Sequence, residues 1–298
     1  MTNHSPGAGA LQAGDTILVL GGTGKTGRRL VPLLRAAGAD VRTAARHDAD
    51  VVFDWSDPAT HDAALAGVDA AYVVPPTLRL DYAPRVAAFV DRAVAAGVRH
   101  VTYLSARGVD HAPAEAPPRA VELDLAARPG LTHAVLRPGW FLQNFHEDFF
   151  VPTGGRIAAP TGGGAEAFVH ADDIAEVAAA TLLAPAEHDG AGYTLTGPAA
   201  LSFADVAAGI AAAVGRPVRH DDLARDEWVR EQVAAGMPGD YAELLATLLV
   251  DRVRADVGAP TTADVEKVTG HQPRSFADYA ADPDVVAAWR RAVGAAEA

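Results

Sequence analysis

The chain has no cysteine among its 298 residues. Disulfide bonds, thiol nucleophiles and thiolate metal sites are therefore excluded, while the redox compartment stays open. Positive charge is also scarce, because 25 Lys and Arg stand against 38 Asp and Glu, which gives a formal net charge of -13 at pH 7. Polyanion binding needs clustered positive charge, and no basic run exceeds two residues. We therefore expect neither nucleic acid nor an anionic membrane as a partner.

Long apolar runs are missing as well, since no stretch approaches the roughly 18 residues of a membrane span. The first residues, "MTNHSPGAGALQAG", have neither the cationic start nor the apolar centre of a secretory signal. Hydrophobic residues make up 49% and charged residues 21%, as in ordinary folded proteins. We therefore expect a cytoplasmic protein with a flexible tail over residues 1–14, followed by one large α/β domain or a core with a smaller lobe.

A seven-residue stretch, "GGTGKTG" at positions 21–27, carries the most information about function. Gly24, Lys25 and Thr26 match the end of the P-loop of nucleotide triphosphatases. That loop also needs a glycine five positions before Gly24, where this sequence has Val19. The P-loop interpretation is therefore disfavoured.

The same stretch fits the turn of a dinucleotide-binding domain, which needs a strand, close glycines and a helix whose amino end faces the pyrophosphate. Residues 16–20 form a short apolar run typical of a strand. Residues 25–38 show leucines at helical spacing, with Gly38 where a helix end is expected. We therefore expect the backbone amides near Thr26 to face a bound pyrophosphate.

Strand and helix signals continue to alternate along the chain. Further strands are expected at residues 40–46, 50–54, 69–76, 98–105, 131–139 and 192–197, and a helix at 170–184. This order predicts a Rossmann-like, doubly wound parallel sheet with helices on both faces.

The domain organisation follows from where this alternation breaks down. We expect an NAD(P)-binding core over residues 15–140, to which residues 166–197 return. Residues 141–165 and 198–298 are expected to form a smaller, mostly helical lobe that closes over the strand ends on the substrate side.

The motifs also resemble a known family. Glycines at 21, 24 and 27 are spaced as in the short-chain dehydrogenase/reductase superfamily, and the segments "LRPGWFLQNF", "FVHADDIAEVAAATL" and "VTGHQPRSFADY" resemble landmarks of its NmrA-like atypical group. Within that group the chain looks most like bacterial relatives of clavine dehydrogenases and NADPH-dependent quinone oxidoreductases. The resemblance implies an NAD(P)-dependent oxidoreductase acting on a small molecule.

Ligands of such sheets bind beyond the carboxyl ends of the strands, which makes the strand ends candidate sites. The expected cofactor contacts are Gly21, Thr23, Gly24, Lys25, Thr26, Gly27, Arg46, Asp54, Val74, Pro75, Pro76, Ser105, Pro138 and Gly139. Arg46 stands where an NAD-specific domain places an acidic residue on the ribose, and a guanidinium pairs well with a 2′-phosphate. A solvated arginine would look the same in sequence. We expect NADP(H) to be preferred over NAD(H).

The usual proton donor of the superfamily, a tyrosine assisted by a lysine four residues later, is absent. Neither Tyr103 nor Tyr82 has a lysine at that distance. NmrA-like reductases often carry His or Lys four residues before a helix glutamate, and the residue at that distance from Glu122 is Pro118. Ser105 and Tyr82 are the remaining candidate catalytic residues, although a capping serine would give the same pattern as Ser105.

Substrate contacts are expected from Thr77, Tyr82, Trp140, Phe141 and Asn144, if the smaller lobe closes as predicted. Aromatic residues at this spacing are equally typical of a plain core. No metal site is expected, because His146, Glu147 and Asp148 lack the H-E-x-x-H spacing.

Without a tyrosine acid, hydride transfer suits acceptors that already contain an electron sink, such as iminium ions, quinones or enones. The leading hypothesis is therefore an NADPH-dependent reductase of a small conjugated organic substrate. Two alternatives stay open: an NADP(H)-binding sensor without turnover, and an isomerase or cyclase on the same fold. The sequence does not give the oligomeric state.

Overall fold

The computed structural model describes residues 14–295, and the chain divides into two compact units. The tail predicted over residues 1–14 lies outside the described residues except for Gly14. Unit 1 comprises the chain up to Pro138, the segment Ala171–Leu195 and the short piece Lys267–Gly270. Unit 2 comprises Gly139–His170, Thr196–Glu266 and the chain from His271 onward.

Unit 1 is built on a seven-stranded sheet in the order β3-β2-β1-β4-β5-β6-β9, and every neighbouring pair is parallel. The strands are β1 (Thr16–Leu20), β2 (Asp40–Ala45), β3 (Val51–Val52), β4 (Ala70–Val73), β5 (His100–Leu104), β6 (Thr132–Pro138) and β9 (Ala191–Leu195). The chain order reverses between β1 and β4, so the sheet is doubly wound, as predicted.

The predicted third strand, residues 50–54, is longer than the strand that forms. Only Val51 and Val52 pair with β2. The chain then turns, because the side-chain carboxylate of Asp54 accepts a hydrogen bond from the amide of Ser56 at 2.7 Å. Local turn chemistry ends β3 before the apolar pattern does.

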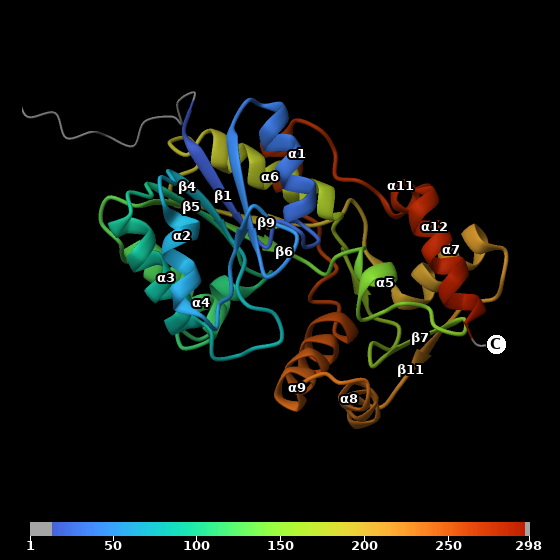
Figure 1. The fold of residues 1–298 in the computed structure, drawn as a ribbon. Helices are drawn as coiled ribbons and strands as arrows, with labels where there is room; N and C mark the ends of the chain where they lie inside the picture. Colours follow the sequence, from blue (N-terminus) through green and yellow to red (C-terminus); the bar gives the residue numbers. More distant parts are fainter. Residues whose placement is uncertain (1–13, 296–298) are drawn as a thin grey trace, which may run out of the picture. The chain divides into compact units, whose positions relative to one another are not determined.

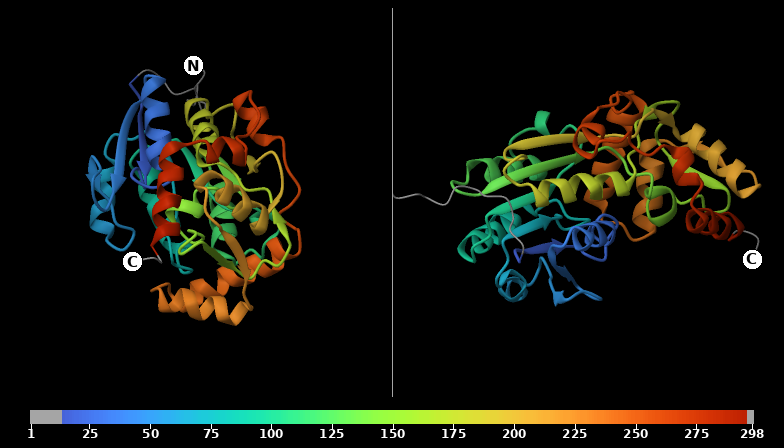
Figure 2. Two further views of the ribbon diagram at one scale, coloured as in Figure 1. Left: turned by 90° about the vertical axis from the view of Figure 1, so that its right-hand side faces the viewer. Right: turned by 90° about the horizontal axis from the view of Figure 1, so that it is seen from above.

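Helices cover both faces of this sheet (Figures 1 and 2). They are α1 (Gly27–Ala36), α2 (His61–Leu65), α3 (Ala83–Ala95), α4 (Pro117–Ala127) and α6 (Ala171–Leu183), with short 3-10 turns at Pro58–Thr60 and Val109–His111. Helix α1 packs beside α6 on one face, while α2, α3 and α4 form a row on the other. All five residues of β1 are buried, as expected for a strand covered on both faces.

Unit 2 has its own hydrophobic core, formed largely by aromatic residues such as Phe145, Phe203, Trp228 and Trp289. Its strands form two short pairs: β7 (Arg156–Ala159) with β11 (Arg219–Asp222), and β8 (Ala165–Glu166) with β10 (Leu201–Ser202). Its helices are α5 (Asn144–Glu147), α7 (Phe203–Val214), α8 (Arg225–Ala234), α9 (Gly239–Leu248), α11 (Phe276–Ala280) and α12 (Pro283–Gly294), with a π-helical turn at Leu249–Arg254. Helix α10 (Asp264–Thr269) contains residues of both units.

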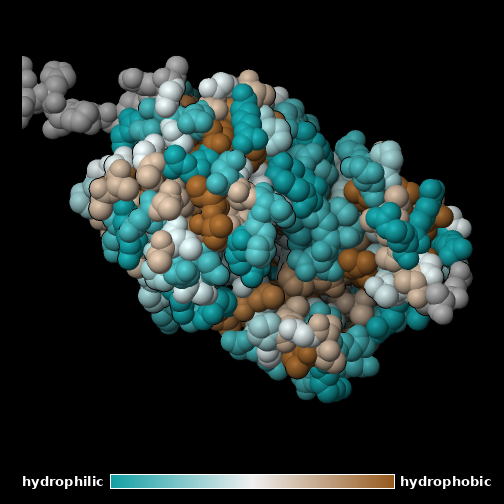
Figure 3. Space-filling view, viewed as in Figure 1, coloured by the Kyte–Doolittle hydropathy of each residue, from teal (hydrophilic) through white to brown (hydrophobic). Residues whose placement is uncertain are grey.

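Exposed large apolar side chains are scattered over the described residues. In unit 1 they are Val52, Leu78, Val94 and Leu123. The space-filling view in Figure 3 shows brown residues over unit 1 as separate spots within a mostly hydrophilic surface. No helix of the described chain has both the length and the apolar composition needed to cross a bilayer.

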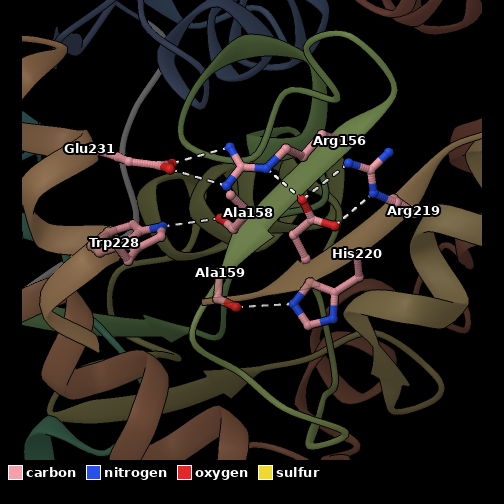
Figure 4. A network of polar contacts seen from close by, with 8 residues as sticks. Arg156, Ala158, Ala159, Arg219, His220, Trp228 and Glu231 are labelled. Carbon is pink, nitrogen blue, oxygen red and sulfur yellow. Dashed lines mark hydrogen bonds and ion pairs between the residues drawn. The ribbon is translucent and has the colours of Figure 1, made fainter. Parts of the chain in front are cut away.

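The polar contacts of unit 2 in Figure 4 link strand β7 to its neighbours. The Arg156 guanidinium donates to Asp221 of β11 at 2.6 Å and to Glu231 of α8 at 3.1 Å. The indole nitrogen of Trp228 donates to the carbonyl of Ala158 at 3.0 Å. We interpret this network as structural, because it fixes β7 between a strand and a helix.

Candidate functional site

The glycine turn between β1 and α1 is tightly packed against itself. Gly21 adopts a left-handed φ of 65°, which glycine tolerates without steric cost, and its amide donates to the carbonyl of Ala44 at 2.8 Å. A Cβ atom on Gly27 would lie 2.2 Å from the carbonyl oxygen of Gly21. The turn therefore needs glycine at position 27 to bring the start of α1 against the end of β1.

This packing leaves two amides at the start of α1 available for a ligand. The backbone N–H groups of Thr26 and Gly27 have no hydrogen-bond acceptor within residues 14–295. Amides in the first helical turn and the helix dipole both favour a bound anion. The geometry fits the pyrophosphate of a dinucleotide cofactor.

A buried tyrosine of the neighbouring strand β4 forms a hydrogen bond with this turn. The hydroxyl group of Tyr72, in β4, donates to the hydroxyl oxygen of Thr26 at 3.0 Å, and both side chains are buried. Burial raises the pKa of the Tyr72 hydroxyl, although the hydrogen bond to Thr26 opposes the shift. Tyr72 therefore stays protonated and donates to the residue that precedes α1. The sequence analysis missed this residue, whose only signal was an aromatic ring within the small-residue run "DAAYVV".

Arg46 lies directly after β2, at the same edge of the sheet as the glycine turn. Its side chain is exposed and forms no hydrogen bond or ion pair with any other residue of the described chain. The neighbouring arginine Arg42, in contrast, donates to the carbonyl groups of Ala64 and Ala66. Arg46 is therefore available to bind an anionic group.

The expected contacts after β4 and β3 differ in exposure. Val74, Pro75 and Pro76 are half-buried, and Thr77 is exposed. Asp54 is half-buried and engaged in its own turn.

Leu78, which the sequence analysis did not single out, follows Thr77 with a left-handed φ of 60° and is 41% exposed. A bulky residue at positive φ is a strained conformation. The turn that follows β4 therefore presents an exposed apolar side chain in a strained conformation.

Ser105, which follows β5, is bonded to a buried carboxylate. Its hydroxyl group lies 2.6 Å from an oxygen of Glu122, which belongs to α4 and is 3% exposed. Arg137 of β6 donates twice to the same carboxylate, at 3.0 and 2.8 Å, and Arg119 donates once at 3.0 Å. Three separate elements of unit 1 therefore meet at this carboxylate.

Opposing effects set the charge of Glu122. Burial raises its pKa, but hydrogen bonds from Arg137 and Ser105 outweigh burial, so the pKa lies below its ordinary value. The pKa of Arg137 is raised, chiefly by its hydrogen bonds to Glu122. Glu122 is therefore a carboxylate at neutral pH.

Both candidate tyrosines of unit 1 are buried. Tyr82 precedes α3, and 9% of its surface is exposed. Tyr103 lies within β5 and is fully buried. The Tyr103 hydroxyl has no hydrogen-bond partner within the described chain. Burial and the nearby Tyr82 and Glu122 raise its pKa well above the ordinary value. Tyr103 is therefore poorly suited to act as an acid.

The remaining candidates lie at the end of β6 and in the residues that follow it. Pro138 ends β6 within unit 1, whereas Gly139, Trp140, Phe141 and Asn144 belong to unit 2. There Trp140 packs against Phe150 at a ring-centroid distance of 5.4 Å, and Asn144 is buried. A role for these residues in substrate binding stays a prediction.

The parallel sheet, the glycine turn and the two amides without acceptors define a dinucleotide-binding α/β protein. A family model described as NAD(P)H-binding matches residues 21–185. The chain is 37% identical over 276 residues to the uncharacterized oxidoreductase YesF of Bacillus subtilis, an alignment that covers 90% of this chain and 94% of that protein. It is 33% identical to agroclavine dehydrogenase of Claviceps fusiformis, over 90% of this chain and 96% of that protein. It is 32% identical to the NAD(P)H azoreductase of Xenophilus azovorans, over 89% of this chain and 96% of that protein.

Solved structures show the same fold. The triphenylmethane reductase of a Citrobacter species, solved with NADP(H), has a TM-score of 0.70 at 20% identity, covering 93% of this chain and 99% of that one. The NADPH-dependent quinone oxidoreductase of Escherichia coli has a TM-score of 0.70 at 23% sequence identity, covering 89% of this chain and 98% of that one. The negative transcriptional regulator NmrA has a TM-score of 0.68 at 17% sequence identity, covering 91% of this chain and 96% of that one. The chain belongs to the NAD(P)H-binding oxidoreductase family. The predicted fold and the predicted NAD(P)-dependent oxidoreductase class are thus confirmed.

Proposed function

We propose that the protein is an NADPH-dependent reductase that transfers hydride to a small, conjugated organic acceptor. The observation that carries the proposal is the combination of an amide-lined glycine turn with an unpaired arginine at the next strand end. The amides of Thr26 and Gly27 would hold the pyrophosphate, and Arg46 would pair with a 2′-phosphate. The bound dihydronicotinamide supplies the hydride.

The residues around Ser105 restrict the acceptor. Tyr103 is buried with a raised pKa, and the Ser105 proton is directed at Glu122, so neither side chain is set to protonate a carbonyl. An acceptor whose electron sink is already present needs no such proton. The relatives named as a clavine dehydrogenase and an azoreductase support conjugated organic substrates.

Apolar contacts for such an acceptor are available at the carboxyl edge of the sheet. Leu78 is exposed there, beside the half-buried run Val74–Pro76. We propose Thr77 and Leu78 of unit 1 as substrate contacts. The substrate contacts that the sequence predicts for Trp140, Phe141 and Asn144, in unit 2, stay predictions. Apolar surroundings with a few polar groups suit a planar organic molecule.

The test has two stages. NADPH and NADH are first titrated into the protein, with cofactor fluorescence as the signal, and quinones, enones, azo compounds and cyclic imines are then screened for oxidation of the bound cofactor. We expect tighter binding of NADPH and turnover with at least one of these acceptor classes.

A matched pair of variants controls for the cofactor site. Gly27→Ala places a Cβ atom 2.2 Å from the Gly21 carbonyl oxygen and should abolish binding, whereas a Cβ atom on Gly163 meets nothing within 4 Å, so Gly163→Ala should behave as wild type. NADPH binding without turnover of any acceptor would contradict the proposal and favour a cofactor sensor.

A further inference from the structure

Ser105 has one hydroxyl proton, and the geometry determines where that proton points. The Ser105 oxygen lies 2.6 Å from an oxygen of Glu122, a short distance typical of a hydroxyl group donating to a carboxylate. An ionised carboxylate accepts hydrogen bonds and cannot donate them. Ser105 must therefore be the donor, and only its two lone pairs remain for another partner.

The carboxylate of Glu122 is also held in place. One oxygen receives Ser105 and the Nε atom of Arg137, and the other receives Arg119 and an Nη atom of Arg137. The guanidinium of Arg137 has room because position 192 in β9 is glycine, where a Cβ atom would lie 2.5 Å from an Nη atom. With four donors around it, the carboxylate cannot turn away and release the Ser105 proton.

We propose that Glu122 is a positioning residue that makes Ser105 a hydrogen-bond acceptor toward the ligand, so that Ser105 selects acceptor molecules carrying an N–H or O–H donor. The inference rests on the proposed function, which supplies the reductase chemistry and a ligand beyond the end of β5. Within the proposed substrate range, it favours a protonated cyclic imine, whose N–H group can donate to Ser105, over a quinone, whose carbonyl oxygen cannot.

The reaction balances without a proton from the protein. The carbon of the protonated C=N group accepts the hydride, and the C=N π pair becomes the lone pair on nitrogen. The imine is reduced to an amine while the cofactor is oxidised. Reduction of an isolated carbonyl group instead creates a strongly basic alkoxide that needs a proton, which Ser105 does not supply.

A matched substrate pair isolates the hydrogen bond from charge. A protonated cyclic imine and the N-methyl iminium ion of the same ring are both cations and both accept hydride, but only the first has an N–H donor. We expect wild type to favour the protonated imine in kcat/KM by about tenfold, the size of one hydrogen bond. Ser105→Ala should reduce this ratio to about one, and Ser105→Thr, which keeps the hydroxyl group, should restore it.

Glu122→Gln tests the positioning role. The amide nitrogen of glutamine can donate to the Ser105 oxygen, which frees the hydroxyl proton to donate to a ligand. The imine preference should therefore fall, and kcat/KM for a quinone should rise, relative to wild type. Thermal unfolding of each variant checks the fold, and the Ser105 variants test the inference independently if Glu122→Gln does not fold.

Binding provides a readout that needs no turnover. In the presence of NADP+, the cyclic secondary ammonium ion should bind more tightly than its N,N-dimethyl counterpart to wild type, and equally to Ser105→Ala, as followed by tryptophan fluorescence. Equal turnover and equal binding within each pair in wild type would overturn the inference and leave the proposed function intact. Absence of NADPH oxidation with every acceptor would contradict the proposed function, while the binding comparison still decides the role of Ser105.

Discussion

The hydroxyl group of Tyr72 donates a hydrogen bond to the hydroxyl oxygen of Thr26 across the interior of unit 1, at 3.0 Å. One residue lies in a central strand, and the other directly precedes the helix that follows the glycine turn. The bond therefore connects the sheet directly to the proposed phosphate site.

Replacing Tyr72 with phenylalanine should destabilise the protein and weaken cofactor binding. Because Thr26 is buried, loss of its donor should lower the free energy of unfolding by about 1 to 2 kcal/mol. The less constrained amide should raise the dissociation constant for NADPH roughly 3- to 10-fold. Urea unfolding and fluorescence titration measure the two effects, and unchanged values of both would refute this role.

Tyr103→Phe gives the matched control in the neighbouring strand β5. The Tyr103 hydroxyl is buried without a partner in the described chain, so its removal leaves no broken hydrogen bond. We expect equal or greater stability than wild type, unchanged NADPH affinity and retained turnover. Loss of turnover with cofactor binding intact would show that a tyrosine acid operates after all.

Arg46→Ala should remove most of the preference for NADPH over NADH. A charge-assisted contact with the 2′-phosphate is worth roughly 1.5 to 3 kcal/mol, and Arg46 has no other described partner to compensate. Dissociation constants for both cofactors give the preference. Arg92→Ala, which removes an exposed arginine paired with Asp62, is the control and should leave the preference unchanged. Equal affinities for the two cofactors in wild type would show that Arg46 has a different role.

Leu78 should supply apolar surface for the substrate from a strained backbone conformation. Leu78→Ala keeps the positive φ and removes most of the apolar side chain, so we expect a higher KM for an apolar acceptor without a gain in stability. Leu78→Gly should raise KM similarly but be more stable than the alanine variant by about 1 kcal/mol, because glycine tolerates this backbone conformation. A KM unaffected in both variants would remove Leu78 from the substrate site.

His100 should make stability depend on pH. The residue is 1% exposed, and burial lowers its pKa from 6.5 to about 4. Between these values the unfolded chain binds a proton that the folded chain does not, so stability is present above pH 6.5 and falls as the pH drops toward 4. A shift of this size corresponds to roughly 3 kcal/mol.

Urea unfolding of wild type and His100→Gln, followed by circular dichroism at several pH values, measures this dependence. Burial also lowers the pKa values of His133 and His188, so the difference between the two proteins isolates His100. The variant should lose less stability on acidification than wild type, and the exposed His47→Gln control should match wild type. Identical slopes for wild type and His100→Gln would contradict the assignment.

Local sequence pattern was sufficient to predict several features of this protein. Short apolar runs alternating with helices predicted the parallel sheet, and the glycines of the first turn predicted a dinucleotide site. Gly38 was expected to end α1, and it does so with a left-handed φ of 85°. Such signals are readable because a strand, a tight turn or a helix end depends on neighbouring residues.

Which polar groups contact one another depends on the packing of segments that are distant in the sequence. Ser105 and Glu122 are 17 residues apart, and Tyr72 and Thr26 are 46 apart, so no local pattern links them. Burial then fixes the outcome, because a polar group removed from water must find a partner among whatever elements the fold places beside it. Ser105 is hydrogen-bonded to a carboxylate, the Tyr103 hydroxyl has no partner within the described chain, and the Arg46 side chain is exposed. The charge and hydrogen-bonding direction at each position follow from that packing, which the order of residues along the chain does not specify.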